Sequence, residues 1–342
     1  MSLGVGTAQA LAAGLLEAAG LARERAERTA EAIVLADVWG VGSHGLLRLP
    51  YYLQRMVAGG YPPDAELVPV SDTGPVVAYD GGGGLGHWQL HLAAKIAAER
   101  CRQFGVAAVS VGNSGHCGAL GAYVLPPLRD GLVSLVFSQG PAVMPAWGGS
   151  EPLLSTSPLA AGIPTRPRPV IVDLATSAVA RGKIAAAAQR GEQLPQGWAL
   201  DADGRPTTDP QKALHGLLAP LGGAKGFVLA LLVESLTGGL VGPLLSADVP
   251  DMFRPEEAAQ PQRVAHLVLA LDPAVLDASG GDGAQERLDD LARRVVASGG
   301  RTPGTGRLFP EEVDQEARLD LPAALEEELR SWARKYGIEA SL

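Results

Sequence analysis

Val111-Gly-Asn-Ser-Gly-His-Cys-Gly-Ala-Leu-Gly-Ala-Tyr123 is the stretch around which the rest of this sequence is arranged. It continues from an apolar run, residues 105–111, whose length and composition are typical of a buried strand. Its glycines at 115, 118 and 121 let the backbone approach a bound group closely, and His116 titrates near neutral pH. The segment is therefore a candidate ligand-binding loop. Its spacing is not the GxGxxG of a dinucleotide fold, and helix packing produces similar glycine patterns.

Length and composition predict two domains in an ordinary soluble protein of 342 residues. The net charge of −9 and the lack of a dense Lys/Arg cluster argue against a nucleic-acid or anionic-membrane partner. We find no apolar run of membrane-spanning length and no signal segment, so we expect a cytoplasmic protein without a membrane partner. Cys101 and Cys117 are expected to be reduced thiols.

The N-terminal residues predict a helical module. Apolar residues at helical spacing predict helices over 7–19 and 22–38, with Gly20 as the stop between them. Pro50 predicts a turn over 43–49 and a helix from 50 to 57. His44 and Arg48 are thereby placed on a helix-entry loop. The alternative is a surface loop in which the arginine pairs with a carboxylate.

From residue 66 onward, β-branched runs alternate with helical patterns. The glycine run 80–86 is expected to be a turn, because it lacks the Lys-Ser/Thr of a phosphate loop. We predict strands over 76–79, 132–137, 170–173 and 265–271, and helices over 88–103, 177–189, 225–241, 285–297 and 321–336. The last helix is expected to dock on the N-terminal helices. The predicted division is a helical module, 1–70 with 310–342, and an α/β module, 71–309.

Seven motifs, in one register, carry a resemblance to a known family. They are Ser43-His-Gly-Leu-Leu-Arg48, Asn113-Ser-Gly-His-Cys-Gly118, Pro145-Ala-Trp-Gly-Gly149, Asp173-Leu-Ala-Thr-Ser-Ala-Val-Ala-Arg-Gly-Lys183, Pro195-Gln-Gly-Trp-Ala-Leu-Asp201, Pro206-Thr-Thr-Asp-Pro210 and Leu221-Gly-Gly-Ala-Lys-Gly226. Together they resemble the malate/L-lactate dehydrogenase family of the second type. The resemblance covers almost the whole chain. It implies an α+β (mixed α/β), non-Rossmann, sulfolactate-dehydrogenase-like fold, a homodimer, and hydride transfer between a nicotinamide cofactor and a small 2-oxo or 2-hydroxy acid.

The reaction needs a cation for the carboxylate, an acid/base group and a nicotinamide pocket. Arg48 can bind a carboxylate through two parallel N–H···O bonds, and Ser43 and His44 are expected to hold the substrate with it. The resemblance implies His116 as the proton donor in one branch of the family and His44 in another; we favour His116. Lys183 is expected at the mouth of the site, where it would disfavour a developing ammonium.

The resemblance also implies a set of cofactor-binding residues: His116, Cys117, Gly118, Ala119, Leu120, Ser138, Gln139, Gly140, Thr156, Asp173, Leu174, Ala175, Lys225 and Gly304. Specificity for NAD usually requires an acid on the adenosine ribose. The position after Gly140, where we look for that acid, is Pro141. The loop over 301–307 also contains two arginines, Arg301 and Arg307. NADP is therefore favoured over NAD.

Two positions depart from the family pattern. Ser157 replaces an asparagine, and Thr305 replaces a glutamate. The remaining histidines do not form a zinc-ligand pattern, so no metal is expected. Cys117 is expected to pack as a small apolar residue and not to act as a nucleophile.

Three functions stay open from the sequence. The first is a 2-oxo-acid/2-hydroxy-acid oxidoreductase, and the second is a cyclic-ketimine reductase of the same family acting on C=N. The third is a catalytically degenerate nucleotide-binding protein, suggested by the residues at 157 and 305. Binding of NADPH followed by its oxidation with a panel of 2-oxo acids separates a catalyst from a binder.

Overall fold

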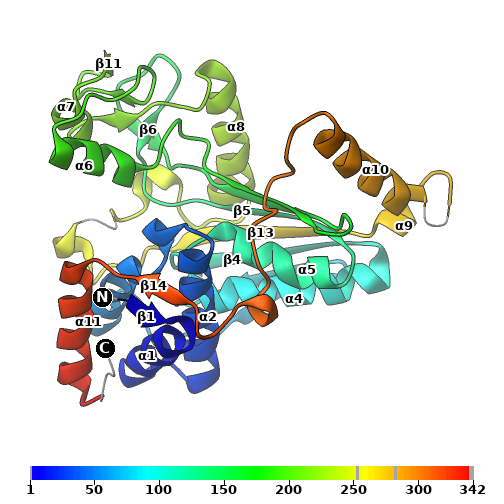
Figure 1. Ribbon diagram of the computed structural model, residues 1–342, viewed down its shortest axis with the longest axis horizontal. Helices are drawn as coiled ribbons and strands as arrows, with labels where there is room; N and C mark the ends of the chain where they lie inside the picture. Colours follow the sequence, from blue (N-terminus) through cyan, green and yellow to red (C-terminus); the bar gives the residue numbers. More distant parts are fainter. Residues whose placement is uncertain (1, 252–253, 281–282, 339–342) are drawn as a thin grey trace.

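A seven-stranded mixed sheet is the centre of the computed structural model, which describes residues 2–251, 254–280 and 283–338 (Figure 1). The strand order is β2 (Val68–Asp72), β3 (Val76–Asp80), β4 (Val106–Ser114), β13 (Val264–Leu271), β5 (Val133–Ser138), β8 (Leu159–Ile163) and β9 (Val170–Leu174). Within this sheet β3 and β4 pair in parallel, and the other neighbours pair antiparallel. The predicted strands are confirmed, and the topology is not that of a doubly wound parallel sheet.

The helical module forms a layer beside the sheet (Figure 1). It contains α1 (Val5–Ala18), α2 (Arg23–Val38), α3 (Leu49–Ala58) and α11 (Ala323–Tyr336), and β1 (Ser2–Gly4) pairs there with β14 (Arg318–Asp320). Gly20 and Gly59 adopt φ of +105° and +90° after the first and third of these helices, as a C-terminal glycine does. The predicted stop at Gly20 and the docking of α11 on α1 and α3 are confirmed.

Two helices cover one face of the sheet. α4 (Gly86–Phe104) contacts β4 and β13, and α5 (Leu125–Arg129) follows the 3₁₀ segment η3 (Leu120–Val124). The alanines of α4, the leucines of the helical layer and the valines of β4 belong to one continuous apolar core. This core crosses the sequence boundary near residue 70, so the two predicted modules share their interior.

A smaller lobe stands over the opposite side of the sheet (Figure 1, upper left). Its elements are β6 (Met144–Pro145), β7 (Pro152–Leu154), α6 (Arg181–Arg190), β10 (Ala199–Leu200), β11 (Pro206–Thr207), α7 (Pro210–Leu214), β12 (Leu217–Leu218) and α8 (Ala224–Glu234). The lobe has a core of its own, which includes Met144, Ile184 and Ala230. Val233 of α8 packs on Phe137 and Leu267 of the sheet.

The remaining elements are short turns and a projecting arm. The arm consists of α9 (Pro273–Leu276) and α10 (Gly283–Ala297), and none of the described residues of α10 is buried (Figure 1, right). The turns are η1 (Gly42–His44), η2 (Leu46–Arg48), η4 (Ser235–Gly239), η5 (Ser246–Asp248), η6 (Pro255–Glu257) and η7 (Pro310–Glu312). Across the described ranges, no helix has the length and apolarity needed to cross a membrane.

Two predicted helices have different ends. The helix expected over 177–189 begins at Arg181, because Ser177 forms a β-bridge with Pro220 and cannot join it. The helix expected over 225–241 ends at Glu234 and continues as the π-helical turn η4. In that turn the hydroxyls of Ser235 and Thr237 bond to carbonyls four residues back, which competes with the α-helical ladder.

Candidate active site

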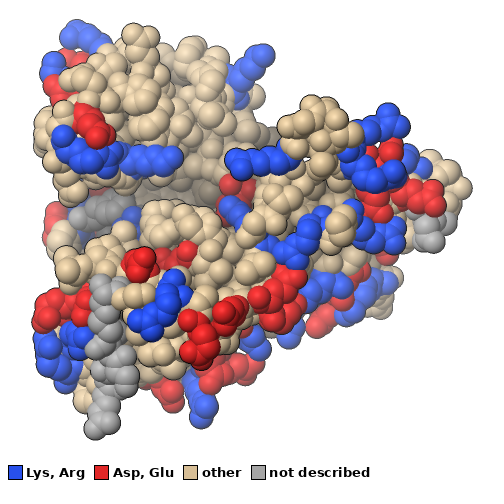
Figure 2. Space-filling model, viewed as in Figure 1, with Lys and Arg blue, Asp and Glu red and all other residues tan. Residues whose placement is uncertain are grey.

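A cavity of about 360 Å³ lies between the helical layer, the end of the sheet and the small lobe. Figure 2 shows a recess between the lobe and the layer below it. Most of the predicted site residues line this cavity: Ser43, His44, Arg48, His116, Cys117, Gly118, Ala119, Leu120, Ser138, Gln139, Gly140, Thr156, Asp173, Leu174 and Ala175. The structure thus brings together motifs that are separated by more than a hundred residues in the sequence.

Asp37 builds the turn that carries His44 and Arg48. Its carboxylate accepts the backbone N–H of Leu46 at 2.7 Å. Gly45 permits this contact, because a β-carbon there would lie 2.1 Å from the Asp37 carboxylate. Burial raises the pKa of Asp37 to about 6, and the bond from Leu46 opposes that shift. Asp37 is a positioning residue that the sequence motifs did not reveal.

Inside this turn the candidate substrate-binding groups are held by one another. The Nε–H of Arg48 donates to the carbonyl of Ser43 at 2.9 Å. The Ser43 hydroxyl lies 2.9 Å from Nδ1 of His44. One short turn therefore fixes the relative positions of a guanidinium and an imidazole on the cavity wall.

The protonation of His116 is set by its neighbours. The backbone N–H of Gly118 lies 3.2 Å from Nδ1, and a backbone N–H can only donate. The hydroxyl of the fully buried Tyr52 also lies 2.8 Å from Nδ1. Nδ1 is therefore the acceptor, and the neutral ring carries its proton on Nε2. This arrangement makes His116 a hydrogen-bond donor within the cavity that it lines.

Both candidate histidines are held in the neutral form. The rings of His44 and His116 stack with centroids 5.8 Å apart and planes 16° apart. Burial lowers the pKa of each imidazole, and the charge of Arg48 lowers both further. For His116, the neighbouring His44 and His87 act in the same direction.

The three glycines of the opening segment make room for protein groups. A β-carbon at Gly115 would lie 2.6 Å from the ring of Tyr61, and one at Gly121 would lie 2.8 Å from the Asp173 carboxylate. Gly118 has φ of +71°, and its β-carbon would meet His87 Nε2 at 2.8 Å. We expected these glycines to admit a ligand; instead they let the loop pack against the side chains that shape the site.

His266 connects the His116 loop to the end of β5, and the sequence motifs missed it. Its Nε2 lies 3.1 Å from the carbonyl of Gly115, which only accepts, so the proton is on Nε2. Its Nδ1 accepts from the hydroxyl of Ser138 at 2.9 Å. Burial lowers the pKa of His266 to about 4, so the ring stays neutral and the chain of bonds is preserved.

An ion pair closes the side of the cavity formed by β9. Arg307 Nη1 lies 3.0 Å from Asp173 Oδ2, and both side chains are mostly buried. The guanidinium of Arg307 also lies over the ring of Trp39, 4.8 Å from its centroid. Asp173 therefore carries a charge that is already matched by a protein cation.

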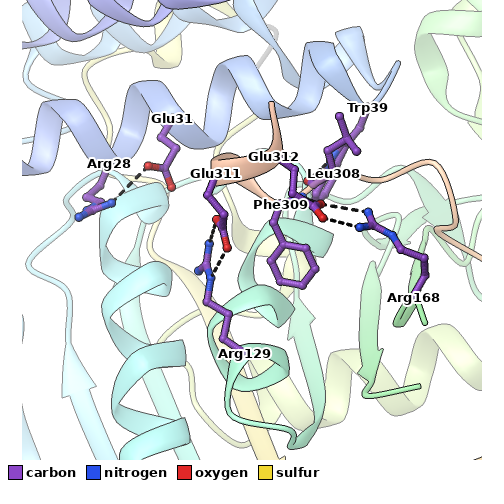
Figure 3. A network of polar contacts seen from close by, with 9 residues as sticks. All are labelled: Arg28, Glu31, Trp39, Arg129, Arg168, Leu308, Phe309, Glu311 and Glu312. Carbon is purple, nitrogen blue, oxygen red and sulfur yellow. Dashed lines mark hydrogen bonds and ion pairs between the residues drawn. The ribbon is translucent and has the colours of Figure 1, made fainter. Parts of the chain in front are cut away.

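The segment after Arg307 is clamped from both sides (Figure 3). Arg129 pairs with Glu311, and Arg168 pairs with Glu312 through two hydrogen bonds. The indole of Trp39 donates to the carbonyl of Leu308 at 2.9 Å. These contacts hold Arg307 in place on the cavity wall.

Three predicted site residues lie outside the cavity lining. Lys183 is exposed on α6, whereas Arg181 of the same turn lines the cavity. Lys225 is exposed in the first turn of α8. Gly304 packs on β9, where a β-carbon would lie 2.6 Å from that of Ile171.

The two departures from the family pattern have structural partners. Ser157 is buried with φ of +41°, and its backbone N–H bonds to the hydroxyl of Ser155 at 3.0 Å. The hydroxyl of Thr305 donates to the carbonyl of Thr302 at 3.2 Å.

Burial raises the pKa of the Cys117 thiol to about 12, so it stays protonated and is a poor nucleophile.

The cavity has room for a small-molecule ligand. Its volume is in the range of small-molecule sites, and a β-carbon at Gly140 would meet no atom within 4 Å, so there is open space beside that backbone. Within the described residues, no group of three or more His, Cys, Asp or Glu side chains is placed to hold a metal ion.

Comparisons with known proteins agree over nearly the whole chain. Residues 5–323 match the family model described as malate/L-lactate dehydrogenase. The chain is 42% identical over 328 residues to a (2R)-3-sulfolactate dehydrogenase (NADP(+)) of Chromohalobacter salexigens, covering 95% of this chain and 96% of that protein. It is 34% identical over 318 residues to a Δ1-pyrroline-2-carboxylate reductase of Ancylobacter novellus, covering 92% and 93%.

The fold has close structural relatives. The sulfolactate dehydrogenase of Methanocaldococcus jannaschii superposes with a TM-score of 0.90 at 28% identity, covering 99% of this chain and 98% of that one. The Δ1-piperideine-2-carboxylate reductase of Pseudomonas syringae superposes with a TM-score of 0.87 at 30% identity, covering 97% and 100%. The predicted sulfolactate-dehydrogenase-like fold is confirmed.

Proposed function

Since this chain belongs to the malate/L-lactate dehydrogenase family, we propose that it reduces a small 2-oxo acid with NADPH and that His116 donates the proton. The chain is an NAD(P)-dependent oxidoreductase of small hydroxy or oxo acids, as its relatives are. The balanced reaction is 2-oxo acid + NADPH + H⁺ giving 2-hydroxy acid + NADP⁺. The cofactor supplies the hydride, which goes to the carbonyl carbon.

The protein's part is to hold the acid and to deliver the proton. Arg48 binds the carboxylate through paired N–H···O bonds, with Ser43 and His44 beside it. His116 offers its Nε2–H to the carbonyl oxygen, where negative charge develops as the hydride arrives. The observation that carries this assignment is the fixed tautomer, because Gly118 N–H and Tyr52 OH both contact Nδ1. His44 is the alternative donor.

The cofactor assignment has two kinds of support. One similar protein carries NADP in its name, and Pro141 lines the cavity where an acid for a ribose hydroxyl would be sought. Ser138 to Gly140, Thr156 and Asp173 to Ala175 would hold the cofactor in the cavity. Lys225 and Gly304 lie outside the cavity lining, so they would contact only a part of the cofactor that extends out of the cavity. Arg307 gives less support than its sequence position suggested, because Asp173 already pairs with it.

A second candidate reaction is the reduction of a cyclic ketimine carboxylate. It is favoured by the similarity to reductases of Δ1-pyrroline-2-carboxylate and Δ1-piperideine-2-carboxylate. The same Arg48 would bind the carboxylate, and His116 would face the C=N nitrogen. The exposed position of Lys183 removes the charge on which we expected discrimination against a ketimine to depend.

We further propose a homodimer in the cytoplasm. Support for the dimer comes from α8, whose Val228, Leu231 and Leu232 are 63%, 44% and 52% exposed, a row of apolar side chains that a second copy would cover. Support for a reducing compartment comes from the two cysteines, which are both free and buried. Size-exclusion chromatography with light scattering on the protein and on Leu232→Asp tests the dimer.

One kinetic panel tests the proposed reaction. NADPH or NADH oxidation is followed with 2-oxo acids and, in parallel, with piperideine-2-carboxylate. We expect turnover of a 2-oxo acid with a higher kcat/KM for NADPH. Faster turnover of the ketimine promotes the second candidate, and equal or better kcat/KM with NADH overturns the cofactor preference. Cofactor binding without any turnover would identify a degenerate nucleotide-binding protein.

A further inference from the structure

His116 has to receive a proton each time it gives one away. In the neutral ring Nε2 carries the single N–H, because Nδ1 accepts from two donors, the backbone of Gly118 and the hydroxyl of Tyr52. A ring that gives up this proton with nothing added at Nδ1 becomes an anion, which a buried site strongly disfavours. The proposed reaction therefore needs a group that supplies a proton to Nδ1.

Tyr52 is the donor of the two that can release its proton. A backbone amide keeps its proton throughout the pH range of proteins, whereas a phenol ionises, with an ordinary pKa of about 10. The hydroxyl of Tyr52 lies 2.8 Å from Nδ1 of His116, which is the usual length of a hydrogen bond from a hydroxyl group. Burial raises the pKa of Tyr52, so at rest the side chain is a phenol that donates to the ring.

The first turn of α3 fixes Tyr52 behind the ring of His116. Tyr52 lies one helical turn after Arg48, the residue that precedes α3, and its side chain is fully buried. Its ring meets that of His87 edge-on, with centroids 4.8 Å apart, and stacks on that of His116, with centroids 5.9 Å apart. His116 lines the cavity, so its imidazole stands between the phenol and the cavity.

The groups that face Tyr52 act in both directions on its ionisation. Burial and the neighbouring Tyr61 raise its pKa, the charge of Arg48 lowers it, and Cys117 raises it slightly further. Burial lowers the pKa of His87 to about 3, so that ring is neutral and adds no charge. A phenolate at this position would therefore lie in the field of one guanidinium, and burial would drive it to take its proton back.

We propose that Tyr52 passes its hydroxyl proton to Nδ1 of His116 while His116 passes its Nε2 proton to the substrate oxygen, so that the ring changes tautomer and stays neutral. This inference rests on the proposed function and names the source of its proton. The O–H bond of Tyr52 and the Nε2–H bond of His116 break, and an Nδ1–H bond and the O–H bond of the hydroxy acid form. Tyr52 acts only through His116.

The phenolate left on Tyr52 accepts a hydrogen bond from the new Nδ1–H, and a charge-assisted bond of this kind is stronger than a neutral one. When the product leaves, Nε2 of His116 takes a proton from water and Nδ1 returns its proton to Tyr52. This return step takes up the one H⁺ of the balanced reaction. The site then has its starting tautomer again.

Tyr52→Phe removes the hydroxyl and keeps the aromatic ring, and Tyr51→Phe is its matched control. Tyr51 precedes it in α3, and the hydroxyl of Tyr51 has no hydrogen-bond partner within the described residues. The rate of hydride transfer is measured on the full chain as NADPH oxidation in a single turnover with a 2-oxo acid. We expect Tyr52→Phe to lower this rate by about 100-fold, with KM for both substrates within about threefold. Tyr51→Phe should stay within about threefold of the wild-type rate.

Two readouts separate proton supply from a structural role. Between about pH 6 and pH 8 the wild-type rate should be constant, because both protons come from the protein. In Tyr52→Phe, His116 acts only after taking a proton from water, so the rate should fall by about tenfold for each unit of rising pH. In mixtures of H₂O and D₂O, two moving protons give the wild type a curved dependence of rate on the deuterium fraction, and one proton gives the variant a straight line. The wild-type curve needs no variant, so it tests the proposal independently of how Tyr52→Phe folds.

Nitrogen NMR of the ligand-free protein tests the starting geometry without catalysis. With ¹⁵N-labelled histidine, the ring of His116 should show the Nε2–H tautomer in the wild type. It should keep this tautomer in Tyr52→Phe, because the backbone N–H of Gly118 still donates to Nδ1. Loss of the spectrum in His116→Gln assigns the signals, and thermal melts check the fold of each variant.

The outcomes that contradict the proposal are distinct. A wild-type rate in Tyr52→Phe overturns it, and so does a straight line for the wild type in the D₂O mixtures. A switch of His116 to the Nδ1–H tautomer in Tyr52→Phe, or an equal loss of rate in Tyr51→Phe, assigns the tyrosine a structural role and also overturns it. Turnover of a 2-oxo acid by the wild type leaves the proposed function intact in these cases, whereas no turnover of any oxo acid or ketimine overturns both.

Discussion

The two walls of the cavity are built in opposite ways. On the His116 side, Tyr52, His87 and His266 are fully buried, and the loop is packed so closely that glycines at 115, 118 and 121 have no room for a β-carbon. On the α6 side, residues 180, 182 and 183 are exposed, and a β-carbon at Gly182 would meet no atom within 4 Å. The polar atoms of the His116 wall are therefore held in fixed positions, as a group that transfers a proton needs, whereas the α6 wall is more open.

The largest effect is expected at the fixed wall, from loss of the proposed proton donor His116. His116→Ala should lower kcat by roughly 10²–10⁴-fold, the usual contribution of a general acid, while the protein stays folded. Stopped-flow or steady-state NADPH oxidation measures kcat, and circular dichroism checks the fold. His44→Ala should act mainly on KM for the oxo acid. The reverse pattern in these two variants would make His44 the donor.

Acid should lower the free energy of unfolding through the buried histidines of the fixed wall. An unfolded histidine binds a proton below about pH 6.5, whereas burial lowers the pKa of His266 to about 4, so the unfolded state binds more protons between these values. His266 therefore contributes stability above pH 6.5 that is lost as the pH falls towards 4. The loss in the free energy of unfolding is on the order of 3 kcal/mol. Urea unfolding from pH 7 to 4 measures the slope.

The histidine variants make this pH prediction specific. His266→Gln should flatten the dependence on pH, even though it lowers the stability at pH 7 by removing the bonds to Ser138 and Gly115. The exposed His215, replaced by glutamine, is the control and should leave the slope as it is in the wild type. An unchanged slope in His266→Gln would show that other groups carry the acid sensitivity; His87, whose burial lowers its pKa to about 3, is the next residue to replace.

Replacement of Arg48, the proposed carboxylate-binding arginine, should cost about 1.5–3 kcal/mol of transition-state stabilisation. Arg48→Lys keeps the charge and loses the planar fork, so KM for the oxo acid should rise far more than KM for NADPH. The two KM values are measured at saturating co-substrate. An oxo-acid KM equal to that of the wild type would remove Arg48 from the substrate site.

The smallest effects compare one glycine from each wall. Gly118→Ala introduces a side chain at φ of +71° beside His87, so it should lower the free energy of unfolding by about 1–3 kcal/mol. Gly182→Ala meets no neighbour and should raise it by about 0.4–1 kcal/mol through the unfolded chain. Urea denaturation measures both. Equal responses would mean that the two walls do not differ in packing.

The sequence predicted most of the elements and one wall of the site. The periodicity of α1, α2, α4 and β13 was strong enough to place each within a few residues, because one face or run of each is consistently apolar. The motifs around His44, His116 and Asp173 predicted residues that do line one cavity. Their spacing could not show that Lys183 points away and Arg181 does not, because that depends on where α6 begins.

The sequence motifs could not predict the residues that position the site residues through hydrogen bonds. Asp37, Tyr52 and His266 act through hydrogen bonds to groups 9, 64 and 151 residues away along the chain. Such partners are set by tertiary packing, which local patterns do not encode. A polar residue inside an apolar strand, such as His266 in β13, was the one available signal, because a buried polar side chain needs a partner.

The position of β13 has a consequence for how the chain folds. Residues 264–271 lie between β4 and β5, which follow one another in the sequence, so these two strands cannot meet and must wait for a strand made about 130 residues later. Pairings of such long sequence separation form slowly. The bond from His266 to the carbonyl of Gly115 can form only once β13 has been made, so one contact of the His116 loop depends on a late part of the chain. The strand at the middle of the sheet thus comes from the last quarter of the 342-residue sequence, after both of its neighbours have been made.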